Sequence, residues 1–396
     1  MKRLLRISLD TLLTSTLPII MWILLGIIVN KNITNIFTLT YPIQFIMGLL
    51  VSIFGIGANI NAVKSKRNNL VDSNIILGCF VGGILTFILC VNVDTYIEFM
   101  SMEVNIYKVF CIYSFILLYL QLILQLVSQK LYYMNENKKS NRLTMFFNIT
   151  NIALIVTISL ITKKQEISVI ITLVIDAIII ALITIKNIKI LKFEFDIINN
   201  MKYVSNDMLD KIGMFIIYFI GFKNTFEYGA IYLVAINFET LITDAQWDMS
   251  YAIITTATID SSKNSLNYKK SINNAYKLIA ILITSTLIMG IILYFYYLPV
   301  LWILAVLLVI QFIDLLLSPT VWIKEQYCQV NISPKIATIN QGIEKIIRII
   351  CSFLPTPFCT YIGQLFSTLY QAAMFNLVYR NRYYLKDGML EMKKNK

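Results

Sequence analysis

Residues 167–185 read ISVIITLVIDAIIIALITI, a run of nineteen residues with one charged side chain, Asp176. A helix needs about 20 mostly apolar residues to cross the hydrocarbon core of a membrane, so this run is typical of a transmembrane helix. Similar runs occupy 9–29, 38–62, 73–93, 106–133, 143–161, 208–224, 229–257, 274–297, 300–323, 336–354 and 358–379. The sequence therefore predicts twelve transmembrane helices.

The overall composition agrees with this prediction. The 396 residues are 58% hydrophobic and only 14% charged, and the mean hydropathy is +0.71. Soluble domains carry about 25% charged residues, which excludes an ordinary soluble protein. Twelve membrane helices leave about ten residues for each loop or tail, too few for a soluble catalytic domain. We expect an all-α, polytopic integral membrane protein.

The net charge of +12 has a topological explanation. If the N-terminus is cytoplasmic, the cytoplasmic segments hold 27 Lys and Arg residues and the outer segments hold five. This asymmetry is the positive-inside rule, and it predicts that both termini are cytoplasmic. It also explains the basic balance without a nucleic-acid partner. The basic then apolar N-terminus lacks a small-residue cleavage site, which favours a first helix over a removed signal peptide.

The residue inventory argues against catalysis. The chain has no histidine, which excludes His-based zinc sites and Ser-His or Cys-His nucleophile pairs. The six cysteines have no paired spacing, and we find no Gly-rich phosphate loop or nucleophile elbow. We therefore expect no enzyme activity, no bound metal and no cofactor, apart from H+ or Na+ as a coupling ion.

The longest basic connector divides the predicted helices into two groups of six. This predicts an N-terminal six-helix bundle at 1–190, a cytoplasmic connector at 191–211, and a C-terminal six-helix bundle with a basic tail at 212–396. The second helix of each half begins at a tyrosine, in Tyr41-Pro42 and Tyr228-Gly229. Two pseudo-symmetric bundles of this kind usually enclose a midplane site and rock against each other.

Polar residues gather on one side of the predicted helix 229–257. At about 100° per residue, one stripe holds Asn237, Thr240, Asp244, Asp248, Tyr251 and Thr255, and Glu239 lies off it. Asp244 and Asp248 are one turn apart near mid-membrane, where two carboxylates repel each other. One interpretation is a cation or proton site that faces a water-filled cavity. The other is a pair of acids neutralised by the basic residues of helix 336–354.

Two further helices carry central acids. Helix 300–323 places Gln311, Asp314 and Ser318 at i, i+3 and i+7, just before Pro319. A proline can kink a helix and free carbonyl groups that coordinate an ion. We expect Asp314 either to couple ion movement or to form a structural hydrogen bond, and Asp176 has the same two interpretations.

Helix 336–354 carries Gln341, Glu344 and Arg348 on one face, with Lys345 beside them. Glu344 and Arg348 can pair at i and i+4, which favours an internal salt bridge. The alternative is contact with an anionic group of a substrate. Charged residues near the bilayer centre are costly, so either interpretation requires partners inside the protein.

Uncharged polar residues complete two further stripes. Helix two carries Gln44, Gly48, Ser52, Gly55 and Asn59, and helix four carries Gln121, Gln125, Ser128 and Tyr132. Small residues let helices approach closely. We therefore expect helix two to pack closely or to line a cavity, with Asn59, Gln121 and Gln125 as candidates for the cavity wall.

Several of these features together resemble the multidrug and toxic compound extrusion (MATE) transporters. The matching features are Leu17-Pro18 early in helix one, Tyr41-Pro42 at the start of helix two, the run Gly55-Ile56-Gly57-Ala58-Asn59-Ile60-Asn61, and Asn148-Ile149-Thr150-Asn151-Ile152 in helix five. With the two groups of six helices, the resemblance covers nearly the whole chain. It implies a transporter, with Asn148 in its cavity. The wider superfamily also includes flippases for lipid-linked oligosaccharides and the peptidoglycan precursor.

The sequence departs from the family pattern in two places. Coupled members typically place an Asp within helix one, but Asp10 lies at the cytoplasmic entrance of this helix. The frequent helix-seven Glu is also missing, because Glu227 falls in the predicted outer loop. Asp314 matches the helix-ten Asp of sodium-binding members. The resemblance therefore places ion coupling in the second bundle, on Asp314 and the Asp244/Asp248 pair.

The balance of intramembrane charge ranks the substrates. The acids are Asp176, Glu239, Asp244, Asp248, Asp314 and Glu344, against the bases Lys345 and Arg348. This excess favours a cationic or amphiphilic small molecule, exported by H+ or Na+ antiport. The alternatives are an exporter of lipid-linked oligosaccharide or peptide, and a transport-inactive membrane sensor or immunity protein. We expect a monomer in the cell membrane of a bacterium.

Overall fold

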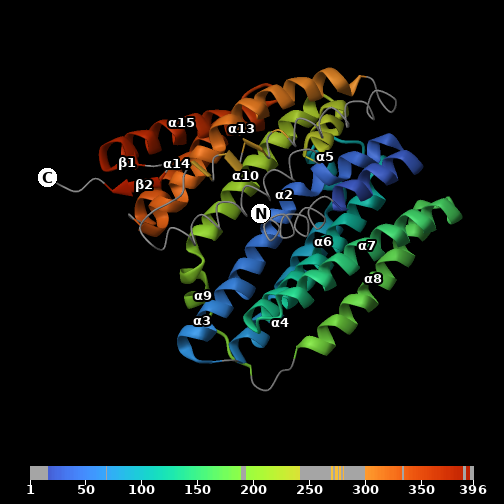
Figure 1. The fold of residues 1–396 in the computed structure, drawn as a ribbon. Coiled ribbons are helices and arrows are strands. Elements are labelled where there is room, and N and C mark those ends of the chain that lie inside the picture. Colours follow the sequence, from blue (N-terminus) through green and yellow to red (C-terminus); the bar gives the residue numbers. More distant parts are fainter. Residues whose placement is uncertain are drawn as a thin grey trace. The chain divides into compact units, whose positions relative to one another are not determined.

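The structure is a computed structural model, shown in Figure 1. It describes residues 17–67, 69–188, 193–240, 269–270, 273–274, 276–277, 280, 299–331, 334–386 and 389–392. The chain forms two compact units. One comprises 17–227, and the described part of the other lies between Tyr228 and Met392.

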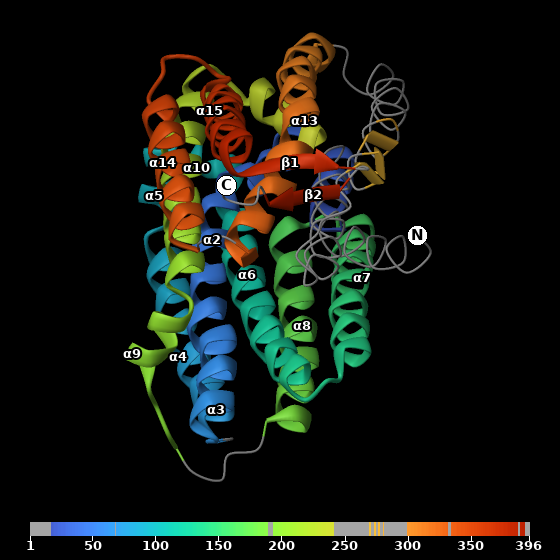
Figure 2. The ribbon, with the colours of Figure 1, turned by 60° about the vertical axis from the view of Figure 1, so that its left-hand side comes forward.

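The unit of 17–227 is a bundle of long helices. Its elements are a helix at Leu17–Ile28, the 3-10 turn Lys31–Thr34, α2 (Asn35–Val51), the π-helical turn Ser52–Gly57, α3 (Ala58–Ser65), α4 (Asn69–Val91), α5 (Val93–Phe99), α6 (Val104–Tyr133), α7 (Asn137–Thr162), α8 (Gln165–Asn187), α9 (Ile197–Tyr203) and α10 (Ser205–Glu227). α6 is central, because it packs against α2, α4, α7 and α8 (Figures 1 and 2). Its side chains Phe110, Tyr113 and Phe115 are fully buried.

The second unit contributes fewer described elements. These are a helix at Ala230–Thr240, α13 (Val300–Asn331), α14 (Pro334–Ser352), α15 (Cys359–Arg382), and the strands β1 (Tyr383–Lys386) and β2 (Met389–Met392). α13, α14 and α15 pack against one another. The two strands form an antiparallel pair in which Tyr383 faces Met392, where the sequence led us to expect only a basic tail.

The described helices lie where hydrophobic periodicity predicts them, whereas most of the predicted helices 229–257 and 274–297 lies outside the described residues. Within the described residues, six helices are long and apolar enough to cross a membrane. The predicted helix at 208–224 is α10, which is continuous over 23 residues. At 1.5 Å per residue it is about 35 Å long, enough to cross. α13 also continues through Pro319 without a break.

The compact unit that begins at Leu17 extends beyond the predicted connector at 191–211, and the predicted division into two six-helix bundles at 190 and 212 stays a prediction. The unit that begins at Leu17 ends at Glu227, so it includes both the connector and α10. The physical reason is the packing of α10 against α2. Phe45 and Tyr218 stack with ring centroids 5.4 Å apart, and the Tyr41 and Tyr218 rings meet edge to face at 4.9 Å.

The short helix α9 is fixed to the end of this unit. It packs against α3 and the π-helical turn, beside α3 in both views (Figures 1 and 2). Asp196 caps the helix by accepting a hydrogen bond from the Asn199 backbone N–H. Hydrogen bonds from Asn199 and Asn61 hold the pKa of Asp196 below its ordinary value.

Gly57 is the point of closest approach between α9 and the bundle. A Cβ atom at this position would lie 2.6 Å from the backbone carbonyl oxygen of Asn200. We expect Gly57→Ala to lower the free energy of unfolding by about 1–3 kcal/mol, because backbone would have to move. Denaturant titration in detergent micelles measures the change.

Gly342→Ala is the matched control for this prediction. Gly342 lies in α14, and a Cβ there would meet nothing within 4 Å. The control variant should be at least as stable as the wild type, because alanine favours the helix. Equal losses in both variants would contradict the close packing of α9.

Candidate functional site

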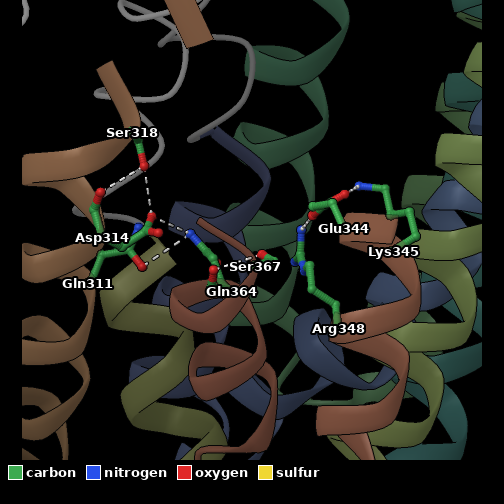
Figure 3. Close-up of polar contacts among 8 residues, drawn as sticks. All are labelled: Gln311, Asp314, Ser318, Glu344, Lys345, Arg348, Gln364 and Ser367. Atoms are coloured by element: carbon green, nitrogen blue, oxygen red, sulfur yellow. Dashed lines mark hydrogen bonds and ion pairs between the residues drawn. The ribbon is translucent and has the colours of Figure 1, made fainter. Parts of the chain in front are cut away.

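Asp314 is the centre of a buried polar cluster in the second unit. Helical spacing places Gln311, Asp314 and Ser318 on one face of α13, and all three are at most 2% exposed. The Ser318 hydroxyl contacts the Asp314 carboxylate at 3.1 Å and donates to the Asp314 backbone carbonyl at 2.8 Å. Figure 3 shows these side chains pointing toward one another.

α15 supplies the remaining partners of this carboxylate. The Gln364 amide donates to Asp314 Oδ2 at 3.0 Å and lies 3.4 Å from Gln311 Oε1 (Figure 3). The Thr368 hydroxyl also interacts with Asp314. In the described part of the chain, no Lys or Arg lies within ion-pair distance of this carboxylate. Neutral groups therefore surround a buried acid.

The sequence analysis did not single out Gln364 or Thr368. A signal for them exists, because Gln364, Thr368 and Gln371 recur at helical spacing on α15, and the last two are buried. The same stripe test that selected Gln311, Asp314 and Ser318 would therefore have found them.

α14 carries a buried charged triad. Glu344 lies between two cations, with Arg348 at 3.1 Å and Lys345 at 2.9 Å (Figure 3). The internal salt bridge predicted from the i, i+4 spacing of Glu344 and Arg348 is therefore confirmed. The triad contains one acid and two bases, so its formal charge is +1.

A second buried carboxylate lies in the unit of 17–227. Asp176 of α8 is fully buried. Its Oδ2 accepts a hydrogen bond from Asn151 Nδ2 of α7 at 2.5 Å, and the same amide group donates to the Tyr113 hydroxyl of α6 at 2.7 Å. Three helices thus meet at this acid, and its hydrogen-bonding neighbours are uncharged.

Glu239 is a third buried acid, in the helix at Ala230–Thr240. It is 2% exposed, and the Tyr361 hydroxyl of α15 donates to its Oε2 at 2.5 Å. Asn237 is also buried in this helix. Asp244, Asp248 and Tyr251, which the sequence predicts on the same stripe, lie outside the described residues.

The remaining candidates for the cavity wall differ in how far they are exposed. Asn148 of α7 is buried and Gln121 of α6 is half-buried, whereas Gln125 is exposed. Asn59 Nδ2 donates to the backbone carbonyl of Gln129 at 2.8 Å, which ties α3 to α6. Asn59 therefore has a structural role, and its role in a cavity stays a prediction.

Three residues of the polar stripe predicted on helix 38–62 make close contacts with other helices. Side-chain carbons of Lys211 lie 3.6 Å from the place of a Cβ on Gly48, and those of Gln129 crowd the corresponding place on Gly55. The Ser52 hydroxyl contacts the Asp207 carboxylate of α10. Of the two expectations for this stripe, close packing is therefore confirmed.

The charged triad generates a prediction about stability. We expect Glu344→Gln to lower the free energy of unfolding by about 3 kcal/mol, because it removes the carboxylate that pairs with the buried Arg348 and the half-buried Lys345. The control is Glu227→Gln. Glu227 also forms an i, i+4 ion pair at 3.1 Å, with Lys223, but its side chain is 49% exposed, against 10% for Glu344. The decrease in the free energy of unfolding caused by Glu227→Gln should be below about 1 kcal/mol.

Denaturant titration in detergent micelles measures both losses. A loss from Glu344→Gln no larger than that from Glu227→Gln would contradict a buried, mutually dependent triad.

Comparison with known proteins identifies the fold. No family model and no curated protein matches the sequence. Among solved structures, an inward-facing multidrug resistance MATE family transporter of the MOP superfamily matches with a TM-score of 0.63 at 14% identity, over 96% of this chain and 97% of that chain. An outward-facing MATE family transporter matches with a TM-score of 0.64 at 15% identity, over 96% and 94%.

A transporter whose binding pocket has the reverse polarity also shares the fold. A MOP superfamily transporter from Pyrococcus furiosus matches with a TM-score of 0.60 at 14% identity, over 96% of this chain and 94% of that chain, and the reverse polarity of its binding pocket suggests a different function for it. These likenesses confirm the predicted all-α, polytopic membrane architecture. The chain has the fold of the MATE transporters, which is built of twelve helices in two bundles.

Proposed function

We propose that the protein is a secondary active transporter that exports organic cations or amphiphilic small molecules by alternating access, in exchange for H+ or Na+. The fold supports a transporter of the MATE type. The observation that carries the coupling proposal is the Asp314 carboxylate, which is 1% exposed and held by neutral partners. We place the ion site at this carboxylate.

The electrostatics of Asp314 support a coupling ion. A lone carboxylate in a low-dielectric interior is costly unless a proton or a cation neutralises it. Arg348, whose positive charge acts on Asp314, already pairs with Glu344. Gln311 Oε1 and Ser318 Oγ add oxygen atoms beside the carboxylate, and hard cations prefer oxygen ligands. A proton or Na+ would therefore bind where no protein cation does.

Asp176 is the corresponding candidate in the other unit. Like Asp314 it is buried, and its hydrogen-bonding partner Asn151 is neutral. The negative charge of this buried carboxylate is therefore costly in the same way as that of Asp314, and a bound proton or cation would neutralise it. We propose that Asp176 is a second place where a cation or the cationic group of a substrate binds.

The sign of the buried charge supports a cationic substrate. Asp176 and Asp314 are buried, and the hydrogen bonds to their carboxylates come from uncharged groups. The described bases of helix α14, Lys345 and Arg348, share Glu344. Each of these buried carboxylates attracts a cation and repels an anion.

A second candidate function is export of a lipid-linked oligosaccharide or peptide. Lys345 and Arg348 favour it, because ammonium and guanidinium groups bind phosphate and carboxylate groups. The reversed pocket polarity of the Pyrococcus furiosus transporter, which suggests a different function for that protein, is consistent with a second substrate class for this fold. A transport-inactive sensor or immunity protein is the third candidate, in which partner binding would persist without substrate movement.

We also propose that the protein lies in the cell membrane of a bacterium as a monomer, with both termini cytoplasmic. The charge bias of 27 to 5 supports this orientation.

Transport in proteoliposomes tests the proposed function. We expect a proton or sodium gradient to drive flux of a fluorescent organic cation through the wild type. Asp314→Asn should lower the gradient-driven flux by at least about tenfold, because an amide cannot exchange a proton and does not neutralise a cation. Fluorescence of the trapped cation measures the flux, and each gradient applied alone names the ion.

Asp176→Asn should also lower the flux of the organic cation. Asp94→Asn is the control for both variants, because Asp94 is 50% exposed and pairs with Lys108 at the surface. Its flux should match that of the wild type. Equal flux through wild type and Asp314→Asn would overturn the ion site, whereas no flux in any variant would favour the lipid-linked substrates or the sensor.

A further inference from the structure

The short helix α9 has its polar and apolar faces reversed relative to a helix on the surface of a soluble protein. A soluble surface helix turns its apolar face toward the core and its polar face toward water. In α9 the buried side chain is Asn200, whereas Ile198 is 83% exposed and Ile197 and Met201 are each 38% exposed. Three of the five exposed side chains of this helix are therefore apolar. Contact with water does not favour this arrangement.

A network of buried amide side chains fixes the rotation of α9 about its own axis. Asn61 Nδ2 of α3 donates to Asn200 Oδ1 at 3.0 Å, and Asn200 Nδ2 donates to Asn74 Oδ1 of α4 at 2.9 Å. All three side chains are buried. A rotation that buried Ile198 would leave the amides of Asn61 and Asn74 without these partners, which is costly. The outward position of Ile198 is therefore built into the fold.

The segment directly before α9 also exposes apolar side chains. Phe193 is 58% exposed and Phe195 is 51% exposed, and the centroids of their rings lie 6.1 Å apart. Between them, the Glu194 backbone N–H donates to the Ser73 hydroxyl of α4 at 3.0 Å, which holds the segment against the bundle. We call the exposed apolar residues of this stretch the connector surface, which comprises Phe193, Phe195, Ile197, Ile198 and Met201.

The connector surface lies at the depth expected of lipid headgroups. The helical segment Asn32–Ser65 is a candidate membrane span of 34 residues, about 50 Å long at 1.5 Å per residue. The hydrocarbon core takes about 30 Å of this length, so a centred span places roughly seven residues at each end among the headgroups. Asn200 closely approaches Gly57 and binds Asn61 near the Ser65 end. Figures 1 and 2 likewise show α9 beside α3 and not beyond its end.

The charge around the connector surface suits an anionic membrane. Residues 186–203 contain four lysines and two acidic residues. Of these lysines, Lys186 at the end of α8 and Lys202 in α9 are exposed. One of the acids, Asp196, is engaged by Asn199 as the cap of α9. Basic residues next to a membrane bind anionic lipids, so the segment combines apolar contact area with the charge that such lipids attract.

We propose that the connector surface is a membrane-binding element that lies in the headgroup region of the lipid leaflet on its side of the protein. Its five apolar side chains insert among the upper parts of the acyl chains, and Lys186 and Lys202 bind the phosphate groups of anionic lipids. Apolar and basic side chains are combined in this way in amphipathic helices that bind membrane surfaces. The inference goes beyond the proposed transport and does not depend on which substrate is moved.

The accessibility of a spin label at Ile198 tests this inference. In protein whose six native cysteines are replaced, single labels at Ile198, Ile178 and Arg67 would be compared in lipid nanodiscs, all at exposed positions. Oxygen concentrates among acyl chains, whereas a nickel chelate stays in water. Ile178 lies midway along α8 and is the lipid reference, and Arg67 is the water reference. We expect the ratio of oxygen to nickel accessibility at Ile198 to lie nearer that of Ile178.

A ratio at Ile198 equal to that at Arg67 would overturn the proposal, and it would then favour a soluble partner for the connector surface. The readout requires no flux. Lipid contact at Ile198 in a protein that transports nothing would therefore count against the proposed function alone. Flux through a protein with a water-exposed Ile198 label would count against this inference alone.

Preference for anionic lipid gives a second test of the lysines. A fluorescent label at Ile198 would be quenched by nitroxide-labelled phosphatidylglycerol or phosphatidylcholine at equal mole fractions. We expect stronger quenching by phosphatidylglycerol, and Lys202→Gln should lower its relative affinity by about fivefold, the contribution of one basic residue near an anionic surface. The control is Lys108→Gln, because Lys108 pairs with Asp94 near the start of α6. Equal quenching by both lipids would overturn the role of the lysines.

Photo-cross-linking of the unsubstituted protein provides a readout that no folding defect can obscure. Phosphatidylglycerol with a diazirine high on its acyl chain would be activated in nanodiscs, and the labelled peptides would be identified by mass spectrometry. We expect labelling within 193–201 and none at the polar turn 64–67, whose four side chains are exposed. Absence of label from 193–201, with label present on α8, would contradict membrane contact at the connector surface.

Discussion

The structure depends on how each carboxylate inside the membrane is accommodated, because water cannot solvate it there. The described residues show two different solutions. Glu344 is neutralised by cations on its own helix. Asp314 and Asp176 are instead held by amide and hydroxyl groups of neighbouring helices. The first solution is complete within the protein, whereas the second leaves a negative charge that a mobile proton or cation can neutralise. This difference is the physical basis for placing ion coupling at Asp314 rather than at Glu344.

The two solutions also explain what the sequence could predict. The Glu344–Arg348 pair and the face shared by Gln311 and Asp314 follow from helical spacing, since both partners lie on one helix. The partners of Asp314 and Asp176 on other helices, Gln364 and Asn151, were not predicted in these roles. Their positions depend on which helices pack together and in what register. Such contacts between distant segments have no periodic signal, although Gln364 belongs to a polar stripe on α15 whose other members, Thr368 and Gln371, are buried.

The helix positions were predicted well because each depends only on a local apolar run. The grouping of the helices depends on side-chain packing and was harder to predict. α10 reads as the start of a second group of six, because a basic connector precedes it. Its aromatic residues pack against α2, however, and Asn200 fixes the connector to α3 and α4. A basic connector indicates the cytoplasmic side of the membrane, whereas the contacts that attach it to α3 and α4 have no local sequence signal, and the division into two groups of six helices stays a prediction.

The central claim is that the Asp314 carboxylate exchanges a proton or a cation with the surrounding solution. Infrared difference spectroscopy on the protein in nanodiscs tests it most directly, because a carboxyl group absorbs differently when it is protonated, ionised or bound to a cation. We predict a difference band on changing pH or adding Na+ that is absent from Asp314→Asn and present in Asp94→Asn. The same band in wild type and in Asp314→Asn would contradict the account.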